Sequence, residues 1–362
     1  DLDSKKLRAK IMERSEQFDL NVPIDMLSED LSVGLQQQVE ILKALFRDCK
    51  ILVLDEPTGV LNEQEKSKLF ESLKSMKKAG MSIIFISHKL DEVLEISDKV
   101  VILSQGKRVD TVITRETSKE DLAKRMVGRE VVFNVSKEEN ADVVNKETVL
   151  ELRNIKVEGK RLASTIKDVS VSVHEGEIFG IAGVDGNGQS ELIEAIAGLR
   201  HVSSGQVFLN GVDVTNSTVQ ETKCKGLGLV PEDRRGVGTV GAYNLDQNIL
   251  LRCCELRKYH KSGGRIDKSK LQENSNNLIE EFDIRIPHRD MPVGQLSGGN
   301  IQKVILAREI SSEPCVLLCM HPTRGLDVGA IEFVRARLLE LADQGCGIVL
   351  VSTELEEIMF LA

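Results

Sequence analysis

The chain has 362 residues and contains 57 acidic against 48 basic residues, which gives a formal net charge of −9 at pH 7. An acidic chain with only 3% aromatic residues is not typical of a protein that binds nucleic acid through basic tracts or base stacking. The sequence has no run of about 18 apolar residues, so we expect no membrane-spanning segment in it.

Short apolar runs alternate with helix-like segments along the chain. Such runs are typical of buried parallel strands, and they occupy residues 51–54, 83–86, 100–103, 178–182, 316–319 and 348–351. Apolar residues at helical spacing predict helices over 64–78 and 331–343, and an amphipathic helix over 267–282 within a more helical insertion. This alternation predicts an α/β layered fold.

One module occurs twice in the sequence. Residues 31–93 align without a gap with residues 296–358, at an offset of 296 − 31 = 265. The segments LSVGLQQQVEI, ILVLDEPTGVLN and IIFISHKLDEV correspond in order to LSGGNIQKVIL, VLLCMHPTRGLD and IVLVSTELEEI. Because three separated blocks keep one register, we predict two copies of a single module.

Neither copy is expected to be complete. The second copy has a glycine-rich segment at 183–190, and its equivalent in the first copy would precede residue 1. The first copy continues beyond the point that corresponds to residue 362. We therefore expect a piece of a longer chain. The C-terminal part of the first module would occupy 1–130, a polar linker 131–146, and a second module, cut at its C-terminus, 147–362.

The glycine-rich segment predicts a phosphate-binding loop. GVDGNGQS follows an apolar strand and precedes a helix, which is the context of a G-x-x-x-x-G-K-[ST] motif. Its backbone N–H groups and the helix N-terminus would face phosphate, although the lysine position holds Gln, at a cost of about 1–3 kcal/mol. The alternative is an ordinary tight turn. The candidate binding residues are Gly183, Asp185, Gly186, Asn187, Gly188, Gln189 and Ser190.

Acidic residues and a histidine follow strands of the first copy. Asp55 and Glu56 come at the end of one apolar run, and His88 follows the next. Phosphoryl transfer needs one carboxylate for Mg²⁺ and another group beside the attacking water. Neighbouring side chains at a strand end can serve these two partners because they point in different directions.

A serine followed by small residues opens a predicted helix in each copy. In the second copy, Ser297, Gly298 and Gly299 offer a hydroxyl and closely approaching N–H groups, which suit a phosphate. In the first copy, Ser32 and Gly34 flank a valine, whose bulk would obstruct that approach. The alternative for both serines is a plain helix cap.

Together these motifs resemble the ATP-binding cassette (ABC) family. LSGGNIQK, ILVLDEPT, ISHKL and GVDGNGQS carry the likeness, and the tandem arrangement with VPEDRRGVG resembles the double-cassette ATPases of bacterial simple-sugar and nucleoside importers. The resemblance implies tandem P-loop NTPase modules, the ABC nucleotide-binding domains, each with a helical signature subdomain. It implies that Asp55 holds Mg²⁺ through water, with Ser190 a weaker Mg²⁺ candidate. Glu56 would polarise the attacking water, and His88 would contact the γ-phosphate.

Cassettes of this family pair head to tail, so that the acids of one meet the signature of the other. Here one composite site would join residues 55, 56 and 88 with 297–299, and the other would join 189, 320, 321 and 353 with 32–34. The second set has Met320, His321 and Thr353 where the first has acids and histidine. The resemblance therefore implies one competent and one degenerate site.

Two departures from the family pattern accompany this pairing. Asn62 stands at the D-loop aspartate, and Glu232 lies in the Q-loop region where Gln is usual. The neighbouring Arg234 and Arg235 are either surface charges or contacts to a partner.

The resemblance implies a subunit that binds and hydrolyses ATP with Mg²⁺ and powers uptake of a simple sugar or nucleoside. Its partners would be two membrane permease subunits and a substrate-binding protein, with no nucleic acid, at the cytoplasmic face of a bacterial cell membrane. The chain as given is expected to hydrolyse little ATP, because the first phosphate loop would lie outside it. The alternatives are a non-catalytic regulatory nucleotide binder and a soluble tandem ABC protein that acts on ribosomes.

Overall fold

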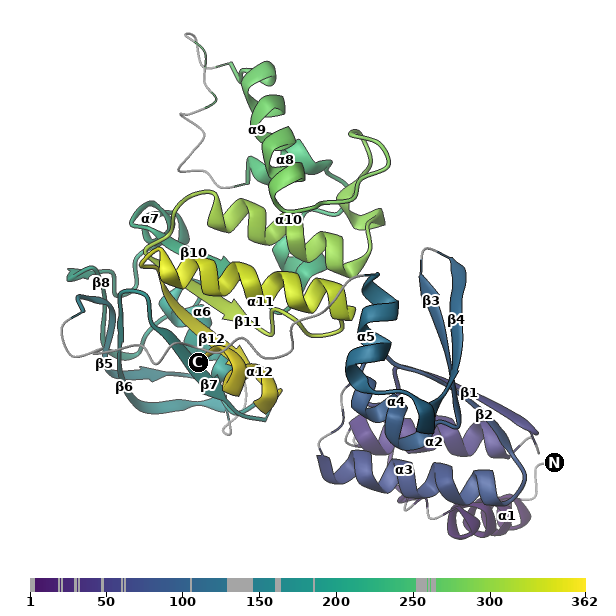
Figure 1. The fold of residues 1–362 in the computed structure, drawn as a ribbon. Helices are drawn as coiled ribbons and strands as arrows, with labels where there is room; N and C mark the ends of the chain where they lie inside the picture. The colour runs from purple at the N-terminus through teal and green to yellow at the C-terminus, as the bar shows by residue number, and fades with distance from the viewer. Residues whose placement is uncertain are drawn as a thin grey trace. The chain divides into compact units, whose positions relative to one another are not determined.

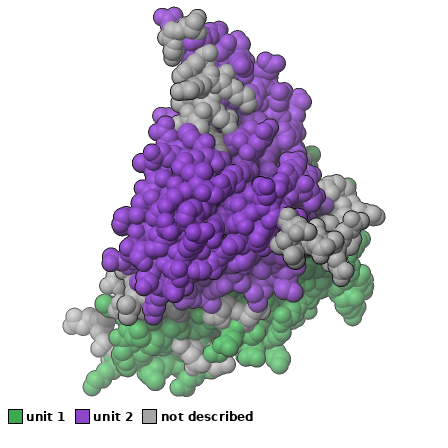
Figure 2. Space-filling view, turned by 90° about the vertical axis from the view of Figure 1, so that its left-hand side faces the viewer, with its two compact units in different colours: residues 1–131 green, residues 132–362 purple. Residues whose placement is uncertain are grey.

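In the computed structural model the chain separates into two compact units, residues 1–131 and 132–362 (Figures 1 and 2). The structure describes residues 4–18, 20, 22–28, 31, 33–46, 49–59, 61, 63–104, 106–128, 146–159, 164–184, 186–251, 259, 261 and 265–362. The predicted linker lies outside these residues except for Lys146, and so do the candidates Ser32, Asn62 and Asp185.

A four-stranded parallel sheet lies at the centre of unit 2, residues 132–362 (Figure 1). Register pairs Val230 with Cys319, Met320 with Val351, and Ser352 with Ala182, so the carboxyl ends of the strands share one edge. The strand order is β10 (Leu227–Val230), β11 (Val316–Met320), β12 (Gly347–Ser352) and β7 (Ile178–Ala182). The prediction of buried strands is confirmed for β11 and β12, which are buried along their whole length.

Side chains from the two faces of this sheet enter two hydrophobic clusters. On one face Leu317, Cys319 and Leu350 pack with residues of α10 (Gly298–Ile310) and α11 (Val328–Asp343). On the other face the partners come from α6 (Gln189–Ile196) and β5 (Thr148–Val157), and the sheet contributes Val316, Leu318, Val349 and Val351. The alternation of side chains along each strand distributes them between the two layers.

An antiparallel sheet and a helical region flank this centre. The helical region, drawn in green in Figure 1, gathers α8 (Leu245–Ile249), α9 (Lys268–Glu281) and α10. The predicted amphipathic helix is α9, where Asp267 accepts hydrogen bonds from the first-turn N–H groups, and Leu271, Ser275 and Leu278 are buried. The remaining elements are β6 (Ile166–His174), β8 (Ser204–Leu209), β9 (Val212–Asp213), α7 (Val219–Cys224) and α12 (Leu355–Leu361).

Unit 1, residues 1–131, is built around two parallel strands and a helical layer. β1 (Ile51–Asp55) pairs with β2 (Ser82–Ile86), and Leu52, Leu54, Phe70 and Leu73 belong to its core. The other elements are α1 (Ser4–Gln17), α2 (Val33–Leu45), α3 (Glu63–Lys78), α4 (Leu90–Ile96), β3 (Lys99–Ser104), β4 (Lys107–Ile113) and α5 (Lys119–Val127). An α/β fold is therefore present in both units.

Two predictions about burial in unit 1 are wrong. The run at 100–103 is not a buried parallel strand: it lies in β3, which pairs antiparallel with β4, and Leu103 is 69% exposed. β1 and β2 are strands as predicted, but one face of β1 is buried and one face of β2 is only half-buried, while Ile51, Val53, Ile84 and Ile86 are exposed. An apolar run specifies an extended segment, but its burial depends on what packs over it.

None of the helices in the described part of the chain combines the length and apolarity needed to cross a bilayer.

Candidate functional site

The ends of β1 and β11 share an uncommon backbone conformation. Glu56 and His321 occupy equivalent positions in the two copies and have φ values of 47° and 45°. Their N–H groups donate to the carbonyls of Ile86 and Val351, at 2.9 and 2.8 Å. Non-glycine residues enter this left-handed region only where the surrounding structure holds them. The two copies therefore keep one turn geometry although its side chains differ.

A buried hydrogen bond recurs beside each turn. Thr58 donates to Glu92 at 2.6 Å, and Thr323 donates to Glu357 at 2.6 Å. Each bond ties the turn after one strand to the helix that follows the next strand. Burial raises the pKa of the Glu357 carboxyl above its ordinary value. Sequence reasoning missed this pair, although Thr and Glu recur at the same spacing in both copies.

The structure brings the predicted catalytic residues of unit 1 together. Asp55 ends β1, and the Nδ1 atom of His88 lies 2.8 Å from Oε1 of Glu56. An ionised carboxylate only accepts, so this contact favours the Nδ1–H tautomer and leaves Nε2 for another partner. The His88 side chain is 16% exposed and that of Glu56 is 42% exposed, so both remain within reach of a substrate.

Unit 2 lacks this cluster at the same edge. Met320 and His321 stand where Asp55 and Glu56 stand in unit 1, and both are buried, at 6% exposure. Thr353, in place of His88, is exposed. Among the described residues no group of three or more His, Cys, Asp or Glu side chains is arranged to hold a metal ion.

The predicted phosphate loop connects β7 with α6, and the side chain of Gln189 folds back over it. Its Nε2 donates to the carbonyl of Val184 at 3.0 Å, and its Oε1 accepts from the N–H of Asn187 at 3.1 Å. Gly188 caps α6 with φ of 99°, and a Cβ on Gly183 would lie 2.2 Å from Gln189 Nε2. Gln189 thus accepts a hydrogen bond from the N–H group of Asn187, which the motif would direct at phosphate. Gly186 and Ser190 lie in the same loop and in the first turn of α6.

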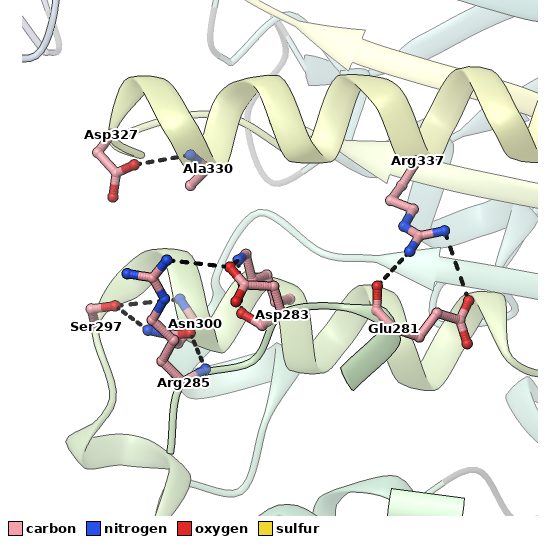
Figure 3. Close-up of polar contacts among 9 residues, drawn as sticks. Glu281, Asp283, Arg285, Ser297, Asn300, Asp327, Ala330 and Arg337 are labelled. Carbon is pink, nitrogen blue, oxygen red and sulfur yellow. Dashed lines mark hydrogen bonds and ion pairs between the residues drawn. The ribbon is translucent and has the colours of Figure 1, made fainter. Parts of the chain in front are cut away.

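Ser297 begins the helix α10 as its N-cap (Figure 3). Its Oγ accepts from the backbone N–H and from Nδ2 of Asn300, at 3.4 and 2.9 Å. A Cβ on Gly299 would lie 3.2 Å from Cβ of Ala330, so the small residue lets α10 approach α11 closely. In unit 1 the equivalent Gly34 lies in the first turn of α2.

Three arginines surround the start of α10, in a pocket of about 460 Å³ beside Gly298. Arg235 donates to the carbonyls of Gly294 and Leu296, at 2.7 and 3.3 Å, and so holds the segment that precedes Ser297. Arg324 pairs with Glu232 at 2.7 Å, and Arg234 donates to the carbonyl of Arg324.

Arg234 carries a charge without a carboxylate partner among its described contacts. Burial, followed by the like charge of Arg324, lowers the pKa of Arg234. Its Nη1 lies 3.5 Å from the place of a Cβ on Gly298. The pocket is therefore suited to an anion. Sequence reasoning left Arg234 and Arg235 open and missed Arg324, because Arg324 is 90 residues away from Arg234 along the chain.

A larger pocket, of about 920 Å³, lies elsewhere in unit 2. Cys315 and Cys346 line it, and they precede β11 and β12, so it lies at the amino ends of the strands. Ligands of open α/β sheets bind at the carboxyl ends. We therefore do not take this pocket as the functional site.

The family model and the similar curated proteins agree with one another on the family. The family described as "ABC transporter" matches residues 3–59 and 166–324. The glucose import ATP-binding protein TsgD13 of Haloferax volcanii is 43% identical over 98% of this chain and 64% of its own length. The nucleoside import ATP-binding protein NupA of Lactococcus lactis is 42% identical over 99% of this chain and 70% of its own length. The guanosine import ATP-binding protein NupO of Bacillus subtilis is 43% identical over 100% of this chain and 70% of its own length. The chain thus spans 64–70% of the length of these relatives.

Solved structures support the fold alone. A structure of the RNase-L inhibitor has a TM-score of 0.64 at 20% identity, over 98% of this chain and 64% of that one. A bacterial ABC transporter cassette solved as a dimer has a TM-score of 0.50 at 22% identity, over 58% of this chain and 90% of that one. Because relatives of 42–43% identity are named for import, the alternative of a soluble protein that acts on ribosomes is not favoured.

Proposed function

Because the chain belongs to the ABC transporter family, we propose that it is part of an ATP-hydrolysing subunit that energises import of a simple sugar or a nucleoside. The relatives named for glucose, nucleoside and guanosine import support this range of cargo. The partners would be two membrane permease subunits and a substrate-binding protein, and the subunit would act at the cytoplasmic face of the cell membrane.

The contact between His88 and Glu56 at the end of β1 is the observation that carries the proposal. When Mg–ATP binds as the substrate, Asp55 would hold its metal ion through water. Glu56 polarises the attacking water, and His88, oriented through Nδ1, presents Nε2 to the γ-phosphate. This division of roles uses the three side chains at the strand ends, Asp55, Glu56 and His88, that the second copy replaces.

The signature segment of unit 2 would complete this site. Ser297, Gly298 and Gly299 would cap the γ-phosphate with a hydroxyl and N–H groups at the start of α10, provided that the two copies pair head to tail. The positive charge of Arg234 beside Gly298 supports an anion at this place. The proposed catalytic site therefore needs both copies.

We infer that the other composite site binds nucleotide with little hydrolysis. Its phosphate loop, residues 183–190, has a glutamine in place of the lysine, and its strand ends carry Met320, His321 and Thr353. Ser32 and Gly34 would supply the signature. Loss of a general base alone slows a reaction by about 10²–10⁴-fold, so this site would contribute little turnover.

The test is the Glu56→Gln substitution in the full-length protein, co-expressed with its permease subunits. The expected result is ATP hydrolysis and substrate uptake slowed by about 10²–10⁴-fold, with ATP binding retained. Glu71→Gln, on an exposed position of α3, is the matched control and should leave both rates unchanged. An unchanged rate of ATP hydrolysis in the Glu56→Gln variant would show that the residues of unit 1 do not carry out the reaction.

A further inference from the structure

We propose that Asn300 is a positioning residue that commits the hydroxyl of Ser297 to donate a hydrogen bond outward, to a phosphate oxygen. This inference rests on the proposed function, in which Ser297 contacts the γ-phosphate. It adds a reason why the hydroxyl of Ser297 faces phosphate, and the signature segment of the first copy does not share this reason. The argument follows a chain of hydrogen bonds shown in Figure 3.

The first step fixes the orientation of the Asn300 side chain. Its Oδ1 atom lies 2.8 Å from the backbone nitrogen of Arg285, which can only donate. The oxygen of the amide must therefore face Arg285, and the NH₂ group must face the opposite way. The orientation follows from the network, without ambiguity between the two ends of the amide.

The second step fixes the role of the Ser297 hydroxyl. Nδ2 of Asn300 donates to Ser297 Oγ at 2.9 Å, and the backbone N–H of Asn300 adds a longer bond at 3.4 Å. A hydroxyl has two acceptor sites and one proton to donate. Both acceptor sites are taken, so the proton is left for an outside acceptor. Ser297 is exposed, and a phosphate oxygen is such an acceptor.

The third step concerns what holds Arg285 in place. Nζ of Lys303 lies 2.8 Å from both the carbonyl oxygen and Oδ2 of Asp283. Lys303 belongs to α10, the same helix that Ser297 caps, and its side chain is only 10% exposed. The segment that orients Asn300 is thus anchored to the helix that Ser297 caps.

The first copy lacks this arrangement. The position equivalent to Asn300 is 300 − 265 = 35, which is Leu35, and Val33 replaces Gly298. A leucine offers neither an acceptor to a backbone N–H nor a donor to a serine. The device thus accompanies only the signature segment that would serve the catalytic residues of unit 1.

Asn300→Asp tests the proposal because it changes donors and almost no shape. Aspartate still accepts from Arg285 but cannot donate to Ser297, so the hydroxyl turns inward and donates to the carboxylate instead. Asn300→Ala leaves the hydroxyl free to turn outward. An acid in the first turn favours the helix, so Asn300→Asp should keep or raise the melting temperature. A purely structural role for Asn300 would not separate stability from nucleotide binding in this way.

The measurement is retention of radiolabelled ATP on the full-length protein carrying Glu56→Gln, titrated with ATP in the presence of Mg²⁺. Asn300→Asp is expected to raise the ATP concentration for half-maximal retention by about tenfold or more, because a hydrogen bond to a charged group is lost. Asn300→Ala should raise it less. If Asn300→Asp raises the ATP concentration for half-maximal retention no more than Asn300→Ala does, the proposal is overturned.

The Ser297→Gly background separates the hydroxyl from the added charge, and glycine is tolerated at a helix N-cap. In this background Asn300→Asp should have no further effect. If Asn300→Asp weakens ATP retention equally in the Ser297→Gly background, charge repulsion alone explains its effect and the proposal fails. If Ser297→Gly by itself leaves retention unchanged, the proposed contact of Ser297 with phosphate fails instead.

Discussion

The strands that carry the two candidate sites differ in what covers them. In unit 2, residues 316, 318, 349 and 351 are buried beneath α6 and β5, whereas the equivalent residues 51, 53, 84 and 86 in unit 1 are exposed. The turns at the ends of these strands are nevertheless alike, down to φ at Glu56 and His321. The turn geometry is therefore set locally, by the strand pair and the buried Thr–Glu bond, and does not need the second hydrophobic layer.

The largest effect that would sharpen this comparison concerns stability. Leu318→Ala removes a buried side chain and is expected to lower the free energy of unfolding of unit 2 by about 2–5 kcal/mol. Val53→Ala, at the equivalent position in unit 1, should cost less than about 1 kcal/mol, because Val53 is 58% exposed. Urea unfolding of the chain measures both. Equal losses would show that the face of β1 is covered in solution.

A smaller effect concerns the phosphate loop. Gln189→Lys restores a cation and releases the N–H of Asn187, so ATP should bind the loop of unit 2 about tenfold tighter or more. Gln189→Ala releases the same N–H without a charge and serves as the matched control. Calorimetric titration of the full-length protein would detect the change. No gain from lysine would argue against phosphate binding by this loop.

The smallest effect concerns pH. Burial raises the pKa of Glu357 above its ordinary value of 4.5, so its contribution to stability is fully present below pH 4.5 and is lost as the pH rises through the raised pKa. Glu357→Gln should therefore raise the melting temperature near neutral pH, and the gain should shrink as the pH falls towards 4.5. Glu356→Gln, at the exposed neighbouring position, should show no such trend.

The sequence was sufficient for features that depend on short-range patterns. The strand positions and the amphipathic helix α9 follow from apolar runs and helical spacing. The contact between Glu56 and His88 agrees with the roles that the family resemblance implied for them. The antiparallel pairing of β3 and the exposed face of β1 did not follow, because an apolar run does not specify its neighbours.

Side-chain networks between distant segments were also beyond the sequence. The gathering of Arg234 and Arg324 beside Gly298, and the link from Arg285 through Asn300 to Ser297, depend on loops that fold together only in three dimensions. The return of Gln189 onto its own loop depends on one rotamer. Spacing in a sequence carries no signal for either kind of contact.

The central claim is that the acids of unit 1 split ATP while the equivalent positions of unit 2 do not. The most direct test is the amount of ATP split in a single turnover of the full-length protein with its permease subunits and excess Mg–ATP. The account predicts one ADP per protein molecule, and none in Glu56→Gln on the same timescale. Two ADP per molecule, or one ADP that survives the substitution, would contradict it.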